Sequence, residues 1–331
     1  MHATEFSVRL AIGCVVGWLA AAVQAADPLT PAEQARYADL EARGLQTFTN
    51  VDLADYLALR HKDFAARGES PDPGEAIGFF AQKALGQRFR LNAVRFDYAE
   101  ADCVVFVERA IAMALSPDWP TYYRLCERLR HKDGKVDYRN RNFQTLADWL
   151  PNNRWLLTDV TDTLAEDESE SFAFAVRPKV FADAPAAAGS KYTRTVFKGS
   201  DWKAPPEIIT ESYIPKSQVW DVVASLRTGD IVLILYKSSG GHLGCNHMGV
   251  VYVDADEVSM IAGGPPAVRR IPLAGMAGYR TVAGFKFLRL RPDARALAAA
   301  QSAAVTAQPA PPEQEDKIVA AYRAAREKAS Q

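Results

Sequence analysis

The spacing of apolar residues changes along this chain, and that change limits the fold more than any other sequence feature. Between Gly74 and Leu115 the apolar residues recur with helical spacing twice, in EAIGFFAQKALG and in CVVFVERAIAMAL. Between residues 204 and 291 the pattern becomes short β-rich runs, DIVLILY, HMGVVYV, VSMIAG and FKFLRLR, separated by Gly, Asp and Pro turns. Helices followed by strands predict an α+β fold rather than a doubly wound sheet.

Turn-forming residues and composition divide the chain into four segments. Residues 1–25 form the first segment, and residues 26–73 are expected to be a helical N-terminal extension that ends in the linker ESPDPG. Residues 74–292 are expected to form the main domain. Residues 293–331 are rich in Ala, Gln and Pro, with PAPPEQED before a last charged helix, and this composition predicts a mobile tail.

The first segment has the features of a secretory signal peptide. Arg9 precedes the apolar run LAIGCVVGWLAAAVQA, which ends in small residues, so cleavage is expected after Ala25. The alternative is an uncleaved anchor, but the run is shorter than the roughly 20 residues that a membrane helix needs, and Asp27 follows at once. No second apolar run approaches that length. The sequence therefore predicts a periplasmic or secreted protein with no membrane span after cleavage.

The charge balance argues against a polyanionic partner. The chain has 331 residues and a formal net charge of -1, with both signs interspersed, so it carries no basic field that would hold a nucleic acid. Nothing in the sequence indicates an oligomeric state.

Three cysteines remain once the signal segment is removed: Cys103, Cys126 and Cys245. An odd number in an exported protein leaves at least one thiol without an intramolecular partner, and such a thiol is a candidate for chemistry. Cys126 and Cys245 form one possible disulfide pair, which the sequence does not decide.

Cys103 is the strongest candidate for a nucleophile. It starts a predicted helix, and Asp102 before it is suited to cap that helix. The unpaired N–H groups of a first helical turn favour a thiolate and lower the thiol pKa. The alternative is that Cys103 is a small core residue, as most free cysteines are.

His247 is the candidate base. It begins the apolar run HMGVVYV beside Gly249. A cysteine followed far along the chain by a histidine is the order found in papain-like hydrolases, in which the imidazole takes the thiol proton and later protonates the leaving amine. The alternative is a strand-end histidine that hydrogen-bonds to backbone.

These residues resemble a known family of cell-wall enzymes. DCVVFVER at a helix start, followed by GDIV and HMGVV, resembles the NlpC-type cysteine hydrolases. The likeness is closer to the N-acetylmuramoyl-L-alanine amidase-like branch, catalogued as a domain of unknown function, which carries an Asp-Cys-x-x-Phe-x-Glu helix and an Arg-rich segment ending in Trp and paired Asn. Here that segment is RLRHKDGKVDYRNRNFQTLADWLPNN, and VAGFKFLRLRP fits the last strand. The resemblance spans about residues 74 to 291.

The resemblance implies a papain-like α+β fold in which the nucleophile helix packs on an antiparallel sheet. It implies no cofactor, and hydrolysis of an amide bond in peptidoglycan stem peptides or their fragments. The closer branch favours the bond between muramic acid and L-Ala; the alternative is the γ-D-glutamyl-diamino acid bond. Asp102, Arg141 and Trp149 are the candidate substrate-binding residues. Arg141 and Trp149 occupy family-like positions between nucleophile and base, where an Arg with a Trp suits a carboxylate and a sugar or peptide face; the alternative is that they are structural, with Trp149 a core aromatic.

Two positions depart from the family pattern. The residue that orients the imidazole falls in SMIAGG on Ile261 or Ala262, which have no polar side chain, so Ser259 is the nearest candidate. An aromatic hydroxyl of the family corresponds to Phe89.

Two rival interpretations remain. His242, Cys245 and His247 lie within six residues, so a zinc-dependent amidase is one alternative, with Asp254 or Asp256 completing the site. The other is a catalytically inactive domain that binds wall fragments, because the orienting residue is missing.

Overall fold

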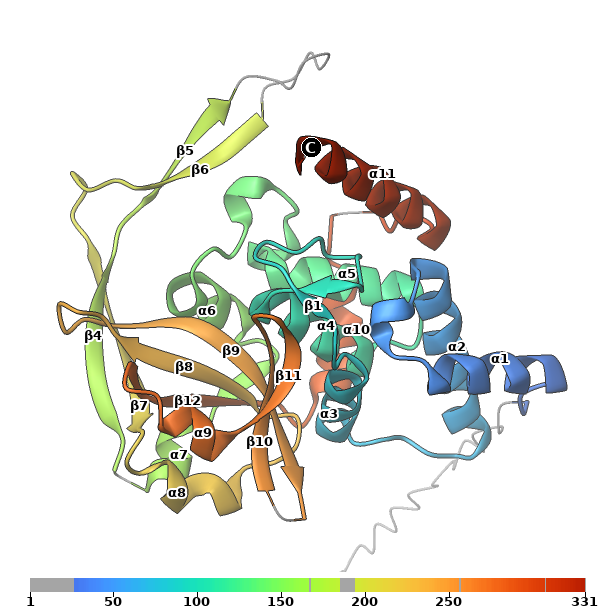
Figure 1. Cartoon of the computed structure of the whole chain (residues 1–331), viewed down its shortest axis with the longest axis horizontal. Helices are drawn as coiled ribbons and strands as arrows, with labels where there is room; N and C mark the ends of the chain where they lie inside the picture. The colour runs from blue at the N-terminus through green and yellow to red at the C-terminus, as the bar shows by residue number, and fades with distance from the viewer. Residues whose placement is uncertain (1–26, 167, 185–193, 256, 307, 331) are drawn as a thin grey trace, which may run out of the picture.

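A curled, mostly antiparallel sheet lies at the centre of the molecule (Figure 1). The computed structural model describes residues 27–330 apart from 167, 185–193, 256 and 307. In this part of the chain the strand order is β2-β1-β11-β10-β9-β8-β12-β7-β4, with β3 paired to β12. The strands are β1 Arg88–Phe89, β2 Glu100–Ala101, β3 Leu157–Asp159, β4 Glu170–Val176, β7 Glu207–Pro215, β8 Ile231–Lys237, β9 Leu243–Asp254, β10 Glu257–Gly264, β11 Ala267–Pro272 and β12 Val282–Leu290.

Helices cover both faces of this sheet. The larger layer contains α3 Pro73–Lys83, α4 Cys103–Leu115, α5 Trp119–Arg130 and α10 Ala294–Ser302, with α4 against β9 and β10. The other face is covered by α7 Thr161–Ala165, α8 Val219–Val222 and α9 Leu273–Ala277. The remaining short helical segments are η1 Leu45–Thr47, η2 Lys132–Gly134, η3 Tyr138–Asn140, η4 Thr145–Trp149, α6 Leu150–Asn153 and η5 Val223–Ser225. The predicted α+β class is confirmed.

Strand β8 is an unbroken apolar run because both of its faces are buried. Ile231 and Leu233 pack in the core beneath the larger helical layer, whereas Val232 and Ile234 pack beneath the opposite layer. A strand that is buried on both faces needs apolar residues at every position.

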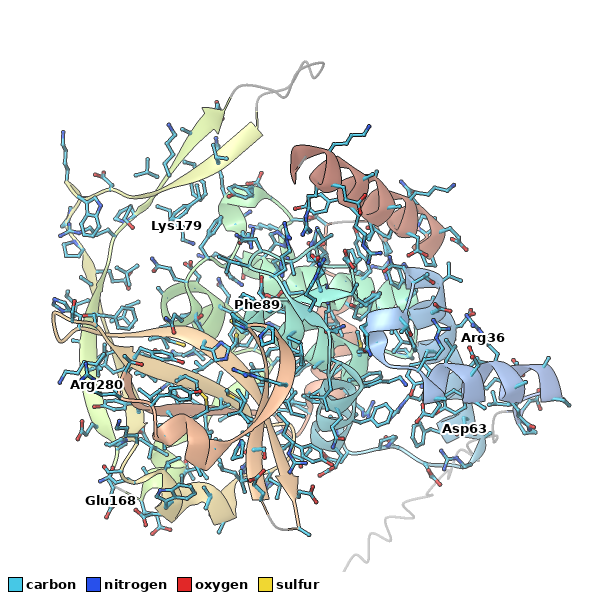
Figure 2. All side chains as sticks on the ribbon, viewed as in Figure 1. Arg36, Asp63, Phe89, Glu168, Lys179 and Arg280 are labelled. Carbon is cyan, nitrogen blue, oxygen red and sulfur yellow. The ribbon has the colours of Figure 1, made fainter. Side chains whose placement is uncertain are left out.

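A two-stranded hairpin that the sequence pattern does not predict projects beyond the sheet. Strands β5 Lys179–Ala184 and β6 Arg194–Ser200 continue from one end of β4 and β7 (Figure 1). Lys179, labelled in Figure 2, forms an ion pair of 2.7 Å with Asp148. The Phe197 ring stacks on Phe143 with 4.7 Å between centroids, and Phe181 packs edge-on against Phe197. These contacts attach the hairpin to the segment that follows α5.

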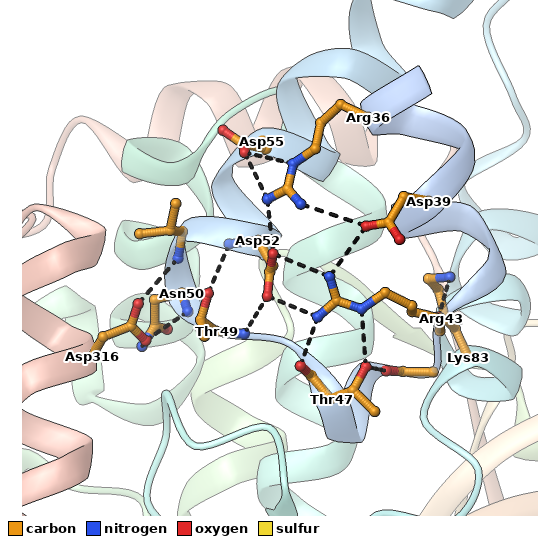
Figure 3. A network of polar contacts seen from close by, with 12 residues as sticks. Arg36, Asp39, Arg43, Thr47, Thr49, Asn50, Asp52, Asp55, Lys83 and Asp316 are labelled. Carbon is orange, nitrogen blue, oxygen red and sulfur yellow. Dashed lines mark hydrogen bonds and ion pairs between the residues drawn. The ribbon is translucent and has the colours of Figure 1, made fainter. Parts of the chain in front are cut away.

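The first described helices are α1 Pro31–Ala42 and α2 Asn50–Ala66. Thr30 and Thr49 each begin a capping box, with Glu33 and Asp52 as the reciprocal partners. The buried Asp52 also accepts hydrogen bonds from Arg36 at 2.8 Å and from Arg43 at 2.9 Å (Figure 3). One carboxylate therefore joins α1 to α2.

The residues after 292, for which the sequence predicts a mobile tail, form α10 and α11 Pro312–Ser330. Asp316 of α11 accepts hydrogen bonds from the backbone N–H groups of Asn50 and Val51 at the start of α2 (Figure 3). Arg323 forms an ion pair with the buried Asp97. Polar side chains of α11 therefore bind polar and charged groups of the rest of the protein.

None of the described helices combines the length and apolar character that crossing a bilayer requires. The predicted signal peptide, residues 1–25, lies outside the described residues.

Candidate functional site

A cavity of about 850 Å³ opens at the N-terminal end of α4. Cys103 and His247, which are far apart in the sequence, both line it. Phe89 of β1, labelled near the centre of the molecule in Figure 2, lines the same cavity. The other lining residues come from the loop before α4, from the segment after α5, from β4, β6 and β9, and from the end of β10: Leu91, Asn92, Asp102, Val104, Glu108, Arg130, Tyr138, Arg141, Asn142, Phe143, Gln144, Thr145, Leu146, Ala147, Phe174, Ala175, Phe197, Leu243, Gly244, Cys245, Asn246, Gly264 and Pro265.

Asp102 fixes the start of the helix that carries Cys103. Its Oδ1 accepts the Val105 N–H at 2.8 Å, which is an N-cap, and its Oδ2 accepts the Ala93 N–H at 3.2 Å. Both carboxylate oxygens thus accept hydrogen bonds from backbone N–H groups, one on the helix and one on the loop before it. The structure places Asp102 at the cavity but gives it a positioning role.

The thiol of Cys103 is protonated at neutral pH. Burial raises its pKa to about 11, and the Asp102 carboxylate adds to this rise. The N–H groups of Met248, Val104 and Cys103 favour the thiolate but do not overcome burial. The helix N-terminus therefore does not lower the pKa as the sequence suggested, because removal of the thiol from water is the larger effect. A base is needed to ionise Cys103.

His247 has the properties of such a base. Burial lowers its pKa below the usual 6.5, and the positive charge of Arg269 lowers it further. The imidazole is therefore neutral at pH 7 and able to accept a proton. Its ring lies beside Gly264: a Cβ added there would be 3.6 Å from Cε1 and 3.9 Å from Nε2.

The structure does not bring Ser259 to His247. Ser259 is buried on β10 and pairs with Tyr252, which is distant from His247 along β9. Its hydroxyl donates to Glu257 at 2.7 Å and accepts from Arg270 at 3.0 Å. Ser259 does not line the cavity, so no orienting group comes from this position. Within the described part of the chain, no residue hydrogen-bonds to the imidazole.

Trp149 is a core residue and not part of the cavity wall. It is 1% exposed, and its Nε1 donates to Glu108 Oε1 at 3.2 Å. Asn153 is also buried and donates to the carbonyl oxygens of Leu129 and Trp149. Arg141, in contrast, lines the cavity, with its guanidinium 5.4 Å from the centre of the Phe143 ring.

Two charged residues of the cavity wall, Glu108 and Arg130, are not among the site residues that the sequence predicts. Glu108 Oε2 accepts both Arg130 Nε at 2.9 Å and Arg130 Nη2 at 2.7 Å, and both residues line the cavity. A signal was present, because Glu108 interrupts the apolar helix CVVFVERAIAMAL and a buried carboxylate requires a partner. The partner was not identifiable without the fold.

Cys245 also lines the cavity, and its thiol lies 3.4 Å from the carbonyl oxygen of His247. Cys103, Cys126 and Cys245 are all free, so the possible pairing of Cys126 with Cys245 does not occur. Cys126 is buried in the helical core.

The zinc alternative finds no support in the described residues, among which no group of three His, Cys, Asp or Glu side chains is placed to hold a metal ion. His242 is exposed, and Asp254 pairs with Arg270 at 3.0 Å. Asp256 lies outside the described residues.

Comparison with known proteins gives a family model and several solved structures. The model described as N-acetylmuramoyl-L-alanine amidase-like matches residues 80–263. A Legionella pneumophila protein assigned to the DUF1460 family is 15% identical with a TM-score of 0.58, covering 74% of this chain and 96% of its own. An N-acetylmuramoyl-L-alanine amidase from Bacteroides uniformis is 18% identical with a TM-score of 0.50, covering 66% of this chain and 99% of its own. At these identities the two structures show a shared fold. No curated protein matches the sequence.

Proposed function

Because the chain belongs to the N-acetylmuramoyl-L-alanine amidase-like family, we propose that it is an exported cysteine hydrolase that cleaves an amide bond in peptidoglycan stem peptides. One observation carries the proposal: a cysteine at a helix N-terminus and a neutral histidine on a strand line the same cavity. This arrangement is that of papain-like hydrolases. No cofactor is required for the reaction.

The proposed reaction starts from a neutral pair. His247 takes the Cys103 proton as the sulfur attacks the substrate carbonyl carbon. The backbone N–H of Cys103, at the first turn of α4, is the proposed donor to the developing oxyanion. The imidazolium then protonates the leaving amine, which leaves a thioester on Cys103. A water molecule, deprotonated by His247, hydrolyses the thioester and restores the thiol.

The bond that we propose is the amide between muramic acid and L-Ala. The family description and the name of the Bacteroides uniformis protein support this choice over the γ-D-glutamyl-diamino acid bond. The mature protein is incubated with a defined muramyl tetrapeptide and the products are weighed by mass spectrometry. Release of the whole tetrapeptide supports the amidase; release of a dipeptide that begins with the diamino acid supports the endopeptidase.

The nucleophile is tested with matched cysteine variants. Cys103→Ala is expected to lower kcat by about a thousandfold or more, because the thiol is the proposed nucleophile. Cys126→Ser, at a buried thiol away from the cavity, is the control for activity, and circular dichroism of both variants checks folding. Retention of more than about a thousandth of the wild-type rate by a folded Cys103→Ala would exclude covalent catalysis by this residue.

The second candidate is a wall-fragment-binding protein without catalysis, which the absence of an orienting group on His247 among the described residues favours. Binding of the muramyl tetrapeptide, with neither bond cleaved, would support it.

A further inference from the structure

We propose that Arg130 and Arg141 form a carboxylate-binding subsite in the catalytic cavity, and that it selects stem peptides whose second residue carries a free α-carboxylate. This inference rests on the proposed peptidoglycan substrate and identifies the group of that substrate, the α-carboxylate of the second residue, that the cavity would bind.

The guanidinium of Arg130 is buried and held in place through two of its nitrogens, which leaves Nη1 without a partner among the described residues. Glu108 Oε2 accepts hydrogen bonds from Arg130 Nε and Nη2, and Glu108 Oε1 accepts a hydrogen bond from Trp149 Nε1. The Arg130 side chain is only 9% exposed, yet it lines the cavity. Among the described residues, none accepts a hydrogen bond from Nη1. Nη1 is therefore available to a ligand in a fixed position.

Arg141 supplies a second cation without a carboxylate partner. In the described part of the chain no Asp or Glu lies within ion-pair distance of it, and its only close partner is the Phe143 ring. A bridge between His131 and Arg141, and the hydrogen bond of 2.9 Å from Asn142 N–H to the Arg130 carbonyl, hold the two arginine-bearing segments side by side.

The two arginines on this part of the wall differ in how they are paired. Glu108 pairs with Arg130 and accepts a hydrogen bond from Trp149, and both oxygens of Asp102 accept hydrogen bonds from backbone N–H groups, so neither carboxylate forms an ion pair with Arg141. Burial lowers the pKa of Arg141, and the neighbouring positive charge of Arg130 lowers it further, whereas the charges of Glu108 and Asp102 act in the opposite direction. An anion bound between the two guanidinium groups would relieve this repulsion.

The proposed substrate carries a suitable anion. A stem peptide continues through the γ-carboxyl group of D-Glu at its second position, so the α-carboxylate of that residue is free. It lies one residue beyond the muramic acid–L-Ala bond, and the cavity that contains both arginines also contains Cys103. A planar guanidinium matches a carboxylate through two parallel hydrogen bonds. The carboxamide of D-isoGln would leave the cations without a counter-charge.

The test compares two muramyl peptides that differ only in having D-Glu or D-isoGln at the second position. Wild-type protein is expected to prefer the D-Glu peptide in kcat/KM by at least about tenfold. Arg141→Gln is expected to lose most of this preference, mainly by raising KM for the D-Glu peptide, while Arg141→Lys retains part of it. Arg139→Gln, at an exposed arginine outside the cavity, is the matched control and should retain the preference. Arg141 has no ion pair with a described carboxylate, so its substitution leaves no buried acid unpaired.

A binding measurement separates this inference from the proposed reaction. The Cys103→Ala variant is titrated calorimetrically with the free peptides L-Ala-γ-D-Glu-diamino acid and L-Ala-γ-D-isoGln-diamino acid. Tighter binding of the first, lost in Cys103→Ala/Arg141→Gln, supports the subsite even if the wild-type protein cleaves neither substrate. Equal binding of both peptides overturns the subsite and leaves the hydrolase proposal standing. Failure to bind either peptide overturns the subsite together with the substrate assignment.

Discussion

Gly263 of β10 lies directly against the peptide that joins Asp102 to Cys103. A Cβ added at Gly263 would lie 2.9 Å from both the carbonyl carbon and the oxygen of Asp102, and 3.3 Å from the Cys103 nitrogen. Those atoms belong to the backbone and cannot rotate away. The absence of a side chain on β10 therefore sets how closely the nucleophile approaches the sheet.

The first prediction concerns this contact. Gly263→Ala is expected to push the start of α4 away from the sheet, to destabilise the fold by about 1–3 kcal/mol and to lower kcat strongly. Gly264→Ala is the matched control, because its Cβ would meet the imidazole at 3.6 Å, an ordinary contact distance, and stability should change by less than about 0.5 kcal/mol. Thermal unfolding and steady-state kinetics measure both. Wild-type kinetics in the Gly263→Ala variant would contradict the proposed role of this contact.

The second prediction concerns the ionisation of Cys103. Because burial raises its pKa to about 11, alkylation of Cys103 by a neutral haloacetamide should increase with pH up to that range. Mass spectrometry of the labelled peptide distinguishes Cys103 from Cys126 and Cys245. An alkylation midpoint below pH 7 would instead indicate a thiolate–imidazolium pair in the free protein.

The third prediction concerns the pH dependence of hydrolysis. His247 must be neutral to take the thiol proton, and burial lowers its pKa below 6.5. The acid limb of kcat/KM should therefore have its midpoint below pH 6.5, with activity increasing as pH rises through the lowered pKa. A midpoint above pH 7 would show that another group, or a differently placed His247, controls the reaction.

The fourth prediction concerns the stability of the N-terminal helices. Asp52→Asn removes the negative charge that Arg36 and Arg43 share and should destabilise the protein by about 1–3 kcal/mol at pH 7. The folded-state pKa of Asp52 lies below its ordinary 3.8, so its stabilising effect is present above pH 3.8 and is lost as pH falls through the folded value. Denaturant unfolding should thus show a wild-type advantage at pH 7 that shrinks toward pH 2. A constant difference across this range would mean that the charge of Asp52 is unimportant.

The fifth prediction concerns the docking of α11. Asp316→Ala removes the acceptor for the Asn50 and Val51 N–H groups and should cost about 1 kcal/mol, as loss of a helix cap does. Hydrogen exchange at the start of α2 should become faster in this variant. Glu313→Ala, at an exposed position in the first turn of the same helix, is the control. Equal exchange rates in the two variants would contradict docking through Asp316.

Local signals in the sequence predicted the features that depend on neighbouring residues. The helical period after Cys103, the capping by Asp102 and the β-rich runs from residue 230 onward predicted the α+β class and the helix that carries the nucleophile. These features depend on backbone geometry and apolar spacing over a few turns, which the sequence contains directly.

Tertiary structure decided the features that depend on distant partners. Ser259 is polar and near in sequence to the expected orienting position, but its place on the strand directs its hydroxyl to Glu257 and Arg270. Trp149 and the polar tail also acquired their roles from partners that no local pattern identifies. The pKa of Cys103 also depends on the tertiary structure, because the fold buries the thiol and the effect of burial exceeds that of the helix N-terminus.

The sequence by itself determined that a cysteine begins α4 and that a histidine precedes the apolar run of β9, and so which two side chains are available as nucleophile and base. Only the tertiary structure decided that they share a cavity with Glu108, Arg130 and Arg141, because chain folding brings α4, α5 and β9 together from separate regions of the sequence. The physical reason is that desolvation and charge pairing depend on what surrounds a group in space, whereas capping and periodicity depend on its neighbours along the chain.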